Sequence, residues 1–214
     1  MHYVFLLGDS IFDNAPYVPK GCEVTAQLQA LLGDEHHVVL LARDGDVLAD
    51  VKGQASRLRV RDTPSAHIVV SCGGNDVLGL VGRMQSRVGS VLEAAEHLAL
   101  WQADFHAGYR RMLDALLVHG LPVAISTIYD GVPGLAPGLR TALAVFNDVI
   151  LREAATRRLP VLDLRLICDQ QEDYSPVSPI EPSQQGGRKI AAAIVTLVRA
   201  HGSAVQQSVV FGPA

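Results

Sequence analysis

The sequence lacks several features that would place the protein in a membrane or outside the cell. It has no run of about 18 consecutive apolar residues, so we expect no membrane-spanning segment. The apolar residues 3–7 are too few for the core of a signal peptide, and no basic leader precedes them. The three cysteines, Cys22, Cys72 and Cys168, are an odd number without the spacing of metal ligands. We therefore expect a cytoplasmic protein with reduced thiols and with neither metal nor cofactor.

Positive charge and aromatic side chains are also scarce. The chain has 18 basic and 22 acidic residues, a net charge of −4, and 5% aromatic residues, which disfavours binding to nucleic acid. The apolar content of 49% excludes a disordered chain, and 214 residues suit one domain with a full core. We expect this domain over residues 1–202 and a frayed tail over residues 203–214, while the oligomeric state stays open.

Short apolar runs alternate with longer helical patterns. Strands are expected at residues 3–7, 38–41, 68–71, 122–126 and 161–164. Helices are expected at residues 24–32, from about residue 47, at 88–119 with a break near Trp101, at 139–157 and at 184–201. Strands that are apolar on both faces and separated by helices predict an α/β fold, a three-layer α/β/α sandwich with a five-stranded parallel sheet.

Polar and glycine residues follow three of the predicted strands. Ser10 comes after the first strand, Gly45 after the second, and Asn75 after the third. In parallel sheets the chemistry lies beyond the carboxyl ends of the strands, so these residues are expected to converge. One hydroxyl with two hydrogen-bond donors suits acyl transfer, because the hydroxyl attacks a carbonyl while the donors stabilise the oxyanion that forms.

These residues resemble the sequence blocks of the SGNH (GDSL-type) hydrolase superfamily. Residues 8–10 (Gly-Asp-Ser) match its first block, Gly45 its second, and residues 73–76 (Gly-Gly-Asn-Asp) its third. The resemblance extends from Leu6 to about Ala192. It implies a flavodoxin-like sandwich and a hydrolase acting on small or carrier-bound acyl esters. It also implies Ser10 as nucleophile, with the Ser10 N–H, the Gly45 N–H and Asn75 as the oxyanion hole.

The fourth block departs from the family pattern. The family has Asp-x-x-His-Pro there, whereas this chain has Ser-Pro-Ile-Glu-Pro over residues 178–182. Glu181 therefore stands in place of the basic histidine, and Ser178 in place of its aspartate. Because burial can raise a glutamate pKa to about 6–7, our hypothesis is that Glu181 accepts the Ser10 proton, directly or through one water. Asp173 is a candidate to assist it.

Most of the histidines are expected at the opposite end of the sheet or at helix ends, and only His97 is a candidate to reach the site. Asp9 and Asp76 flank the key loops, and the simplest expectation is that they bind turn N–H groups. Asp13 and Asn14 are expected to cap the turn after Ser10 locally, and Cys72 to be a buried structural thiol.

Two other functions remain open at this point. Loss of the histidine is compatible with a catalytically impaired protein of the same fold that serves in binding or as a scaffold. Acyl transfer to an alcohol or amine is the other alternative. The chain by itself does not identify the acyl group or the leaving group.

Overall fold

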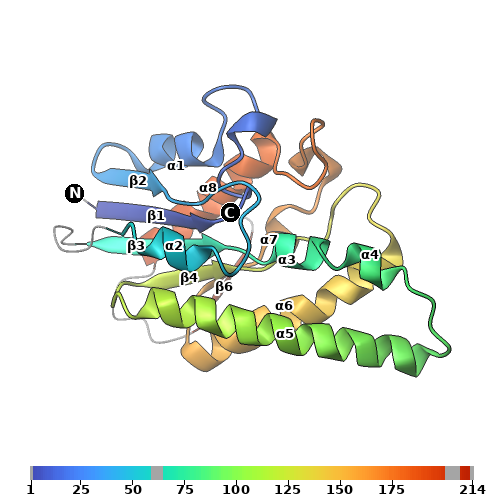
Figure 1. The fold of residues 1–214 in the computed structure, drawn as a ribbon. Helices are drawn as coiled ribbons and strands as arrows, with labels where there is room; N and C mark the ends of the chain where they lie inside the picture. Colours follow the sequence, from blue (N-terminus) through green and yellow to red (C-terminus); the bar gives the residue numbers. More distant parts are fainter. Residues whose placement is uncertain (1, 59–64, 201–207, 213–214) are drawn as a thin grey trace.

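The computed structural model describes residues 2–58, 65–200 and 208–212, and at its centre lies a parallel sheet (Figure 1). The sheet has six strands in the order β2-β1-β3-β4-β5-β6. Their bounds are His2–Gly8 (β1), His36–Leu40 (β2), Ala66–Ser71 (β3), Val123–Ser126 (β4), Val161–Leu162 (β5) and Val210–Phe211 (β6). The α/β class with a parallel sheet is confirmed.

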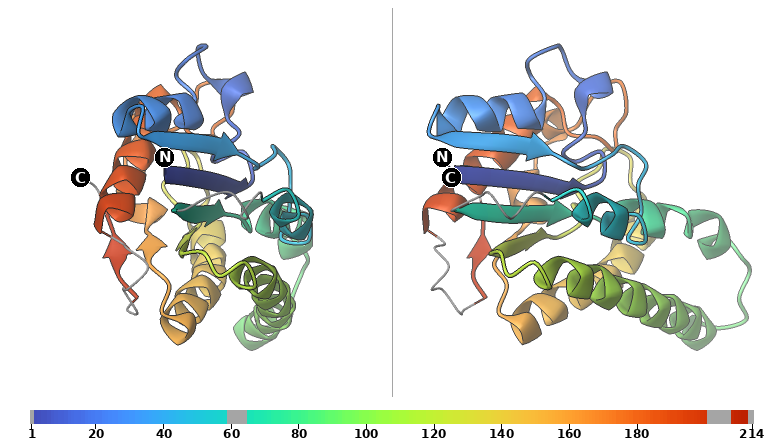
Figure 2. Two further views of the ribbon diagram at one scale, coloured as in Figure 1. Left: turned by 90° about the vertical axis from the view of Figure 1, so that its left-hand side faces the viewer. Right: turned by 60° about the vertical axis from the view of Figure 1, so that its left-hand side comes forward.

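Helices cover both faces of this sheet, as the doubly apolar strands predicted. Along β1, Val4 and Leu6 pack into one core cluster, and Phe5 and Leu7 into the other. Strand residues point alternately to opposite faces, so β1 contributes to both clusters. Figure 2 shows the helices α1 (Val24–Leu32) and α8 (Gln184–Ala200) on one side of the sheet, and α2 (Val51–Ala55) and α5 (Val91–Leu117) on the other.

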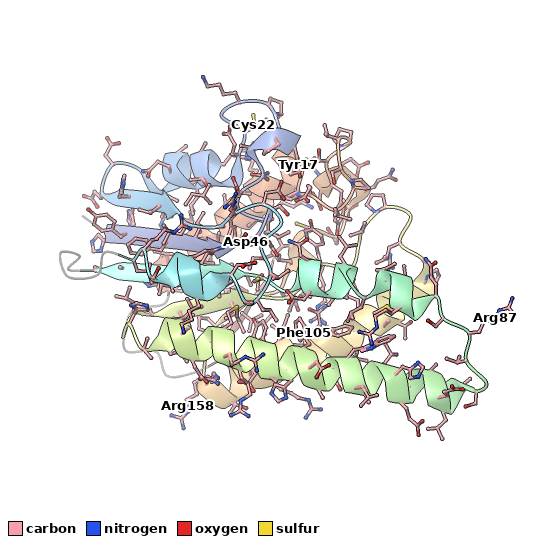
Figure 3. The ribbon with its side chains drawn as sticks, in the orientation of Figure 1. Tyr17, Cys22, Asp46, Arg87, Phe105 and Arg158 are labelled. Atoms are coloured by element: carbon pink, nitrogen blue, oxygen red, sulfur yellow. The ribbon has the colours of Figure 1, made fainter. Side chains whose placement is uncertain are left out.

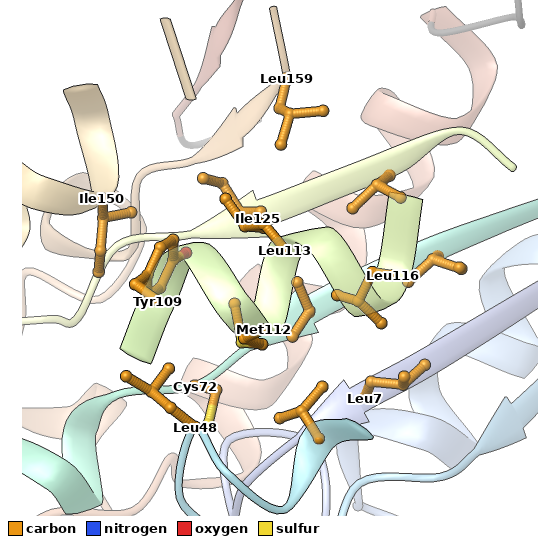
Figure 4. Packing of buried hydrophobic residues seen from close by; sticks show 14 of the residues in the cluster. Leu7, Leu48, Cys72, Tyr109, Met112, Leu113, Leu116, Ile125, Ile150 and Leu159 are labelled. Carbon is orange, nitrogen blue, oxygen red and sulfur yellow. The ribbon is translucent and has the colours of Figure 1, made fainter. Parts of the chain in front are cut away.

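Of the remaining helical segments, α6 (Pro137–Arg157) is long and the others have five residues or fewer. These shorter segments are α3 (Gly74–Leu78), α4 (Val81–Met84), α7 (Leu164–Ile167), η1 (Ala15–Tyr17) and η3 (Gln171–Asp173). Figure 4 shows Met112, Leu113 and Leu116 of α5 packed near Leu7 and Ile125 of the sheet. Among the described residues, no helix is long and apolar enough to cross a membrane.

Several sequence predictions need correction. The predicted break near Trp101 does not exist, since α5 is continuous and packs its second half against the core. The helix expected from about residue 47 begins at Val51 instead. The fifth strand ends at Leu162, because the next residue, Asp163, caps α7 through its side chain.

A sixth strand is the largest difference from the prediction of five strands. Val161 N–H donates to Val209 O at 2.7 Å, and Asp163 N–H donates to Phe211 O at 2.9 Å. Residues 208–212, expected to fray, thus extend the sheet at its edge. A two-residue strand carries almost no periodic signal, and its partner supplies the hydrogen bonds that define it.

Candidate active site

Ser10 lies in a tight turn directly after β1. Gly8 allows this turn, because a Cβ at its position would lie 1.7 Å from the Ser71 carbonyl oxygen of the neighbouring strand. The Asp9 carbonyl then accepts the N–H groups of Phe12 and Asp13, both at 3.2 Å. Within the described ranges, the Ser10 N–H donates to no other residue, so it is available to an oxyanion.

Asn75 lies in the first turn of α3, on the neighbouring strand–helix connection. Its side-chain nitrogen donates to the Asp46 carbonyl at 2.9 Å, which leaves the second N–H of the amide for another acceptor. Figure 3 shows Asp46 near the carboxyl end of β1. Gly45 precedes it with φ of 84°, and among described residues its N–H has no acceptor. Asn75 lines the same pocket as Ser10, whereas Gly45 lies outside this lining.

The loop that carries Glu181 is held in place from three directions. The Ser175 N–H donates to the Glu181 carbonyl at 2.8 Å, and the Glu181 N–H donates to the Ser178 carbonyl at 3.0 Å. The Tyr129 hydroxyl donates to the carbonyl of Ile180. These backbone bonds fix the position from which the Glu181 side chain enters the pocket.

The Glu181 carboxyl is 4% exposed and interacts with the Ser10 hydroxyl. Burial raises the pKa of Glu181 to about 7, the hydrogen bond with Ser10 lowers it in part, and the charge of Asp44 raises it further. Its Oε2 atom is buried without a hydrogen-bond partner among the described residues. A carboxyl with a free acceptor oxygen and a pKa near neutrality can take up a proton at physiological pH.

Ser10, Asn75 and Glu181 open into one apolar pocket of about 140 Å³. Its apolar wall consists of Ile11, Val77, Leu78, Val81, Met84, Ile128, Tyr129, Val132, Leu135, Leu139, Leu143, Leu164 and Ile180. The described lining contains no Lys, Arg or His. An apolar wall with a few convergent polar groups is typical of a small-molecule site.

No described histidine takes the place of the missing base. His97 contacts Trp101 with 6.0 Å between ring centroids, and His106 pairs with Glu153 at 2.6 Å on the face between α5 and α6. His201 lies outside the described residues, and no other histidine lines the pocket.

Two polar residues that were expected to act locally instead make long-range bonds. Asp13 accepts the N–H of Asp44 at 2.9 Å. Asn14 is fully buried, accepts the N–H of Val24 at the start of α1, and donates to the Pro182 carbonyl at 3.3 Å. The prediction of local capping was therefore wrong for both residues. Asn14 instead ties the Ser10 turn to the segment that follows Glu181.

Three further expectations concern the surroundings of the site. Asp173 pairs with Lys189 at 2.7 Å and accepts the Gln170 N–H, so its carboxylate is already engaged away from Glu181. Asp76 accepts the Leu48 N–H at 3.1 Å, as expected for a carboxylate that organises a loop. Cys72 is a buried free thiol beside Leu48 (Figure 4), although it also contributes to the pocket wall.

Gln54 is a site-supporting residue that sequence reasoning missed. Its side chain exchanges two 2.7 Å bonds with the backbone of Gly8 and donates to the Asp46 carboxylate at 2.8 Å. It thereby links the loop of Ser10 to the loop of Gly45. Nothing in the local sequence marks this role, because a polar residue on a short helix is normally solvent-exposed.

Within the described ranges, no group of three or more His, Cys, Asp or Glu side chains is placed to hold a metal ion.

Comparisons with known proteins identify the family and the fold of the chain. The sequence model of the GDSL-like Lipase/Acylhydrolase family matches residues 6–189. No curated protein matches the chain in sequence. A G-D-S-L lipolytic protein from Veillonella parvula has a similar structure, with a TM-score of 0.69 at 18% identity over 93% of this chain and 100% of the other.

Two further solved structures have the same fold. An extracellular lipase from Streptomyces rimosus has a TM-score of 0.63 at 17% identity, covering 92% of this chain and 99% of the other. An aryl esterase from M. smegmatis has a TM-score of 0.63 at 13% identity, covering 94% and 99%. At such identities these likenesses establish the fold, and the family match rests on the sequence.

Proposed function

The chain belongs to the GDSL-like lipase/acylhydrolase family of ester hydrolases, and we propose that it cleaves acyl esters with Ser10 as nucleophile and Glu181 as general base. The observation that carries the proposal is the Glu181 carboxyl, buried beside the Ser10 hydroxyl with one oxygen unpartnered. A serine hydroxyl becomes a nucleophile when an adjacent base accepts its proton.

In the first half-reaction the Ser10 proton moves to Glu181 as the Ser10 oxygen bonds to the carbonyl carbon of the ester. The negative charge thus passes from Glu181 to the carbonyl oxygen. The Ser10 N–H and the free amide N–H of Asn75 are the donors we assign to that oxygen, and the Gly45 N–H, outside the pocket lining, is the third candidate. Protonated Glu181 then gives its proton to the departing alcohol or thiol, and the acyl group stays on Ser10.

In the second half-reaction a water molecule takes the place of the leaving group. Glu181, again ionised, accepts a proton from this water as it attacks the acyl-Ser10 carbonyl. Collapse of the intermediate breaks the bond to Ser10, and the proton on Glu181 returns to the serine oxygen. A glutamate needs no partner to select a tautomer, which is consistent with Ser178 in place of an orienting aspartate.

The pocket supports an apolar acyl group of limited size. Its volume of about 140 Å³ is close to the roughly 150 Å³ of a protein cavity that holds benzene. A short aliphatic or aromatic acyl group would fill this volume. One similar structure is described as an aryl esterase and another as an acetyl xylan esterase, which is compatible with a short acyl group.

Covalent labelling tests the proposal against the alternative of an impaired binding or scaffold protein. A fluorophosphonate probe should label the wild-type protein and should not label the Ser10→Ala variant. Ester hydrolysis should disappear in the same variant. A folded wild-type protein that neither reacts with the probe nor hydrolyses short p-nitrophenyl esters would favour the binding function. Addition of alcohols or amines, followed by product analysis, separates hydrolysis from acyl transfer.

A further inference from the structure

A second carboxyl group, that of Asp9, lies in the wall of the Ser10 pocket. Asp9 and Glu181 are each 4% exposed, and both line the cavity together with Ser10 and Asn75. Asp9 Oδ1 accepts the Ile11 N–H at 3.2 Å, and no side chain of the described residues donates a hydrogen bond to this carboxyl. The proposed reaction uses Glu181 and leaves Asp9 without a role.

The titratable groups around Asp9 are acidic or neutral on every element that packs against it. The titratable or charged groups that interact with the carboxyls of Asp9 and Glu181 are Asp76 of α3, Cys72 after β3, Tyr129 after β4, Asp44 after β2 and Tyr17 of η1. None of them is a cation, and the described pocket lining contains none either. Two carboxylates in an apolar cavity with no cation repel one another and lose their hydration, so one of them retains a proton.

We propose that Asp9 is a positioning residue that holds the single proton shared by this carboxyl pair, so that Glu181 carries the charge and the oxyanion forms beside a neutral acid. This inference rests on the proposed function, because it takes Glu181 as the base. The Ser10 hydroxyl stabilises the ionised form of Glu181, whereas the ionised form of Asp9 is stabilised by backbone N–H groups, among them that of Ile11 at 3.2 Å. Burial and the charge of Glu181 raise the pKa of Asp9 to about 8, and burial raises that of Glu181 to about 7.

The proton count of the reaction explains why this state is the active one. Before attack, Asp9 and Ser10 hold one proton each, and Glu181 carries the charge. After attack, Asp9 still holds its proton, Glu181 holds the serine proton, and the charge lies on the substrate oxygen. If Asp9 were ionised, its charge would oppose the oxyanion in a low-dielectric pocket. If Glu181 were protonated, Ser10 would have no base.

The activity of the wild-type enzyme should consequently be confined to a narrow pH range. The pair loses two protons in sequence, and only the singly protonated pair is active, so kcat/KM should rise through about pH 7 and fall through about pH 8. Beyond each limb we expect about a tenfold loss per pH unit. The pKa values of Cys72 and Tyr129 are raised well above this range by burial, so neither thiol nor phenol produces the alkaline limb.

The decisive variant is Asp9→Asn, which keeps the side-chain oxygen that accepts the Ile11 N–H and cannot ionise. It should keep the acid limb of the kcat/KM profile and lose the alkaline limb. Asp76→Asn is the matched control. It also removes a carboxyl near the site, but the Asp76 carboxyl is only half-buried and lies outside the pocket lining. Its alkaline limb should persist and move to lower pH, because Asp76 raises the pKa of Asp9. An unchanged alkaline limb in Asp9→Asn would refute the inference.

Infrared difference spectroscopy gives a readout that does not depend on activity. In the wild-type protein the carbonyl stretch of protonated carboxylic acid should titrate in two steps, near pH 7 for Glu181 and near pH 8 for Asp9, and Asp9→Asn should lose the step near pH 8. In Glu181→Gln the band should persist to neutral pH but titrate at lower pH, because a negative neighbour is gone. Its absence from the wild-type protein contradicts the inference even if the enzyme is active. If Glu181→Gln is fully active while the band is present, the base assignment fails and the shared proton stands.

Discussion

Two buried glutamates of this molecule, Glu153 on α6 and Glu181 in the pocket, have opposite surroundings. They are 6% and 4% exposed. Glu153 accepts hydrogen bonds from His106 at 2.6 Å and from Arg157 at 2.8 Å. Burial alone would raise the pKa of Glu153, but these two partners outweigh it, and the net effect lowers the pKa. Glu181 has no cationic partner in the described pocket, and burial raises its pKa to about 7.

The difference shows that the partners of a buried carboxyl, more than burial itself, determine its function. Glu153 is a charged, paired group that joins α5 to α6. Glu181 is an unpaired group whose charge changes near neutral pH, which is what a general base requires. The molecule thus contains a Glu–His pair, but on the helical face and not beside Ser10.

Replacing each glutamate by glutamine should separate the two roles most clearly. Glu181→Gln should lower kcat by about 10³-fold, within the range typical of losing a general base. Glu153→Gln should leave kcat close to that of the wild type, because Glu153 lies outside the pocket lining. The measurement is ester hydrolysis at pH 7.5 by folded protein, checked by circular dichroism. Equal activities of the two variants would remove the distinction.

The oxyanion donors stabilise the negative charge that passes from Glu181 to the substrate oxygen, so replacing one of them should lower kcat nearly as much. Asn75→Ala should lower kcat by about 10²–10³-fold, or about 3–4 kcal/mol, with a small change in KM. Asn75→Asp has the same shape but places an acceptor where the donor was, so it should be no more active. Steady-state kinetics on one ester tests both. A main effect on KM would indicate ground-state binding instead.

The free energy of unfolding at neutral pH should fall on replacement of Glu153 and not on replacement of Glu181. Glu153→Gln should lower the free energy of unfolding by about 1–2 kcal/mol, since His106 and Arg157 are only partly buried and Arg157 keeps its ion pair with Asp114. Because the folded-state pKa of Glu153 is lowered, its contribution is present above the unfolded pKa of about 4.3 and is lost as the pH falls through the folded value. Urea unfolding of the wild type and of Glu153→Gln measures this destabilisation at pH 7 and at pH 3. A destabilisation that is equally large at pH 3 would contradict this account.

Glu181→Gln should instead make the protein more stable in alkaline solution. The folded-state pKa of Glu181 is raised, so its contribution to stability is fully present below about pH 4.3 and is lost as the pH rises through about 7. Removing the ionisation should stabilise the protein by on the order of 1–3 kcal/mol at pH 8.5. Urea unfolding at pH 5 and pH 8.5 should show a gain only at the higher pH.

The smallest expected effect concerns the size of the acyl group. Leu143 of α6 is buried at the pocket wall, and Leu143→Ala should move the preference towards longer acyl chains. We expect a gain of about fourfold in relative kcat/KM per added methylene, from about 0.8 kcal/mol each. Ratios between esters within one variant cancel any loss of folded protein. Leu143→Met, which conserves volume, should keep the wild-type preference.

Much of the fold was predictable because its signals are local. The apolar runs of β1 and β3 and the glycines at positions 8 and 73 mark strand ends within a few residues. Ser10, Gly45 and Asn75 were identified as candidates because parallel topology brings strand ends to one edge. Asn14 and Gln54 could not be identified in this way, since their partners, Pro182 and Gly8, are distant in the chain.

The order of strands and helices, the layered class and the identity of the polar groups at the strand ends came from the sequence by itself, because hydrophobic periodicity and turn residues act over short distances. Tertiary structure alone decided that Val210–Phe211 joins the sheet, that α5 runs unbroken, and that Asp9 and Glu181 line one pocket whose described lining has no Lys, Arg or His. The physical reason is that pKa values and edge pairing depend on which distant groups the fold brings together and on how much water it removes between them.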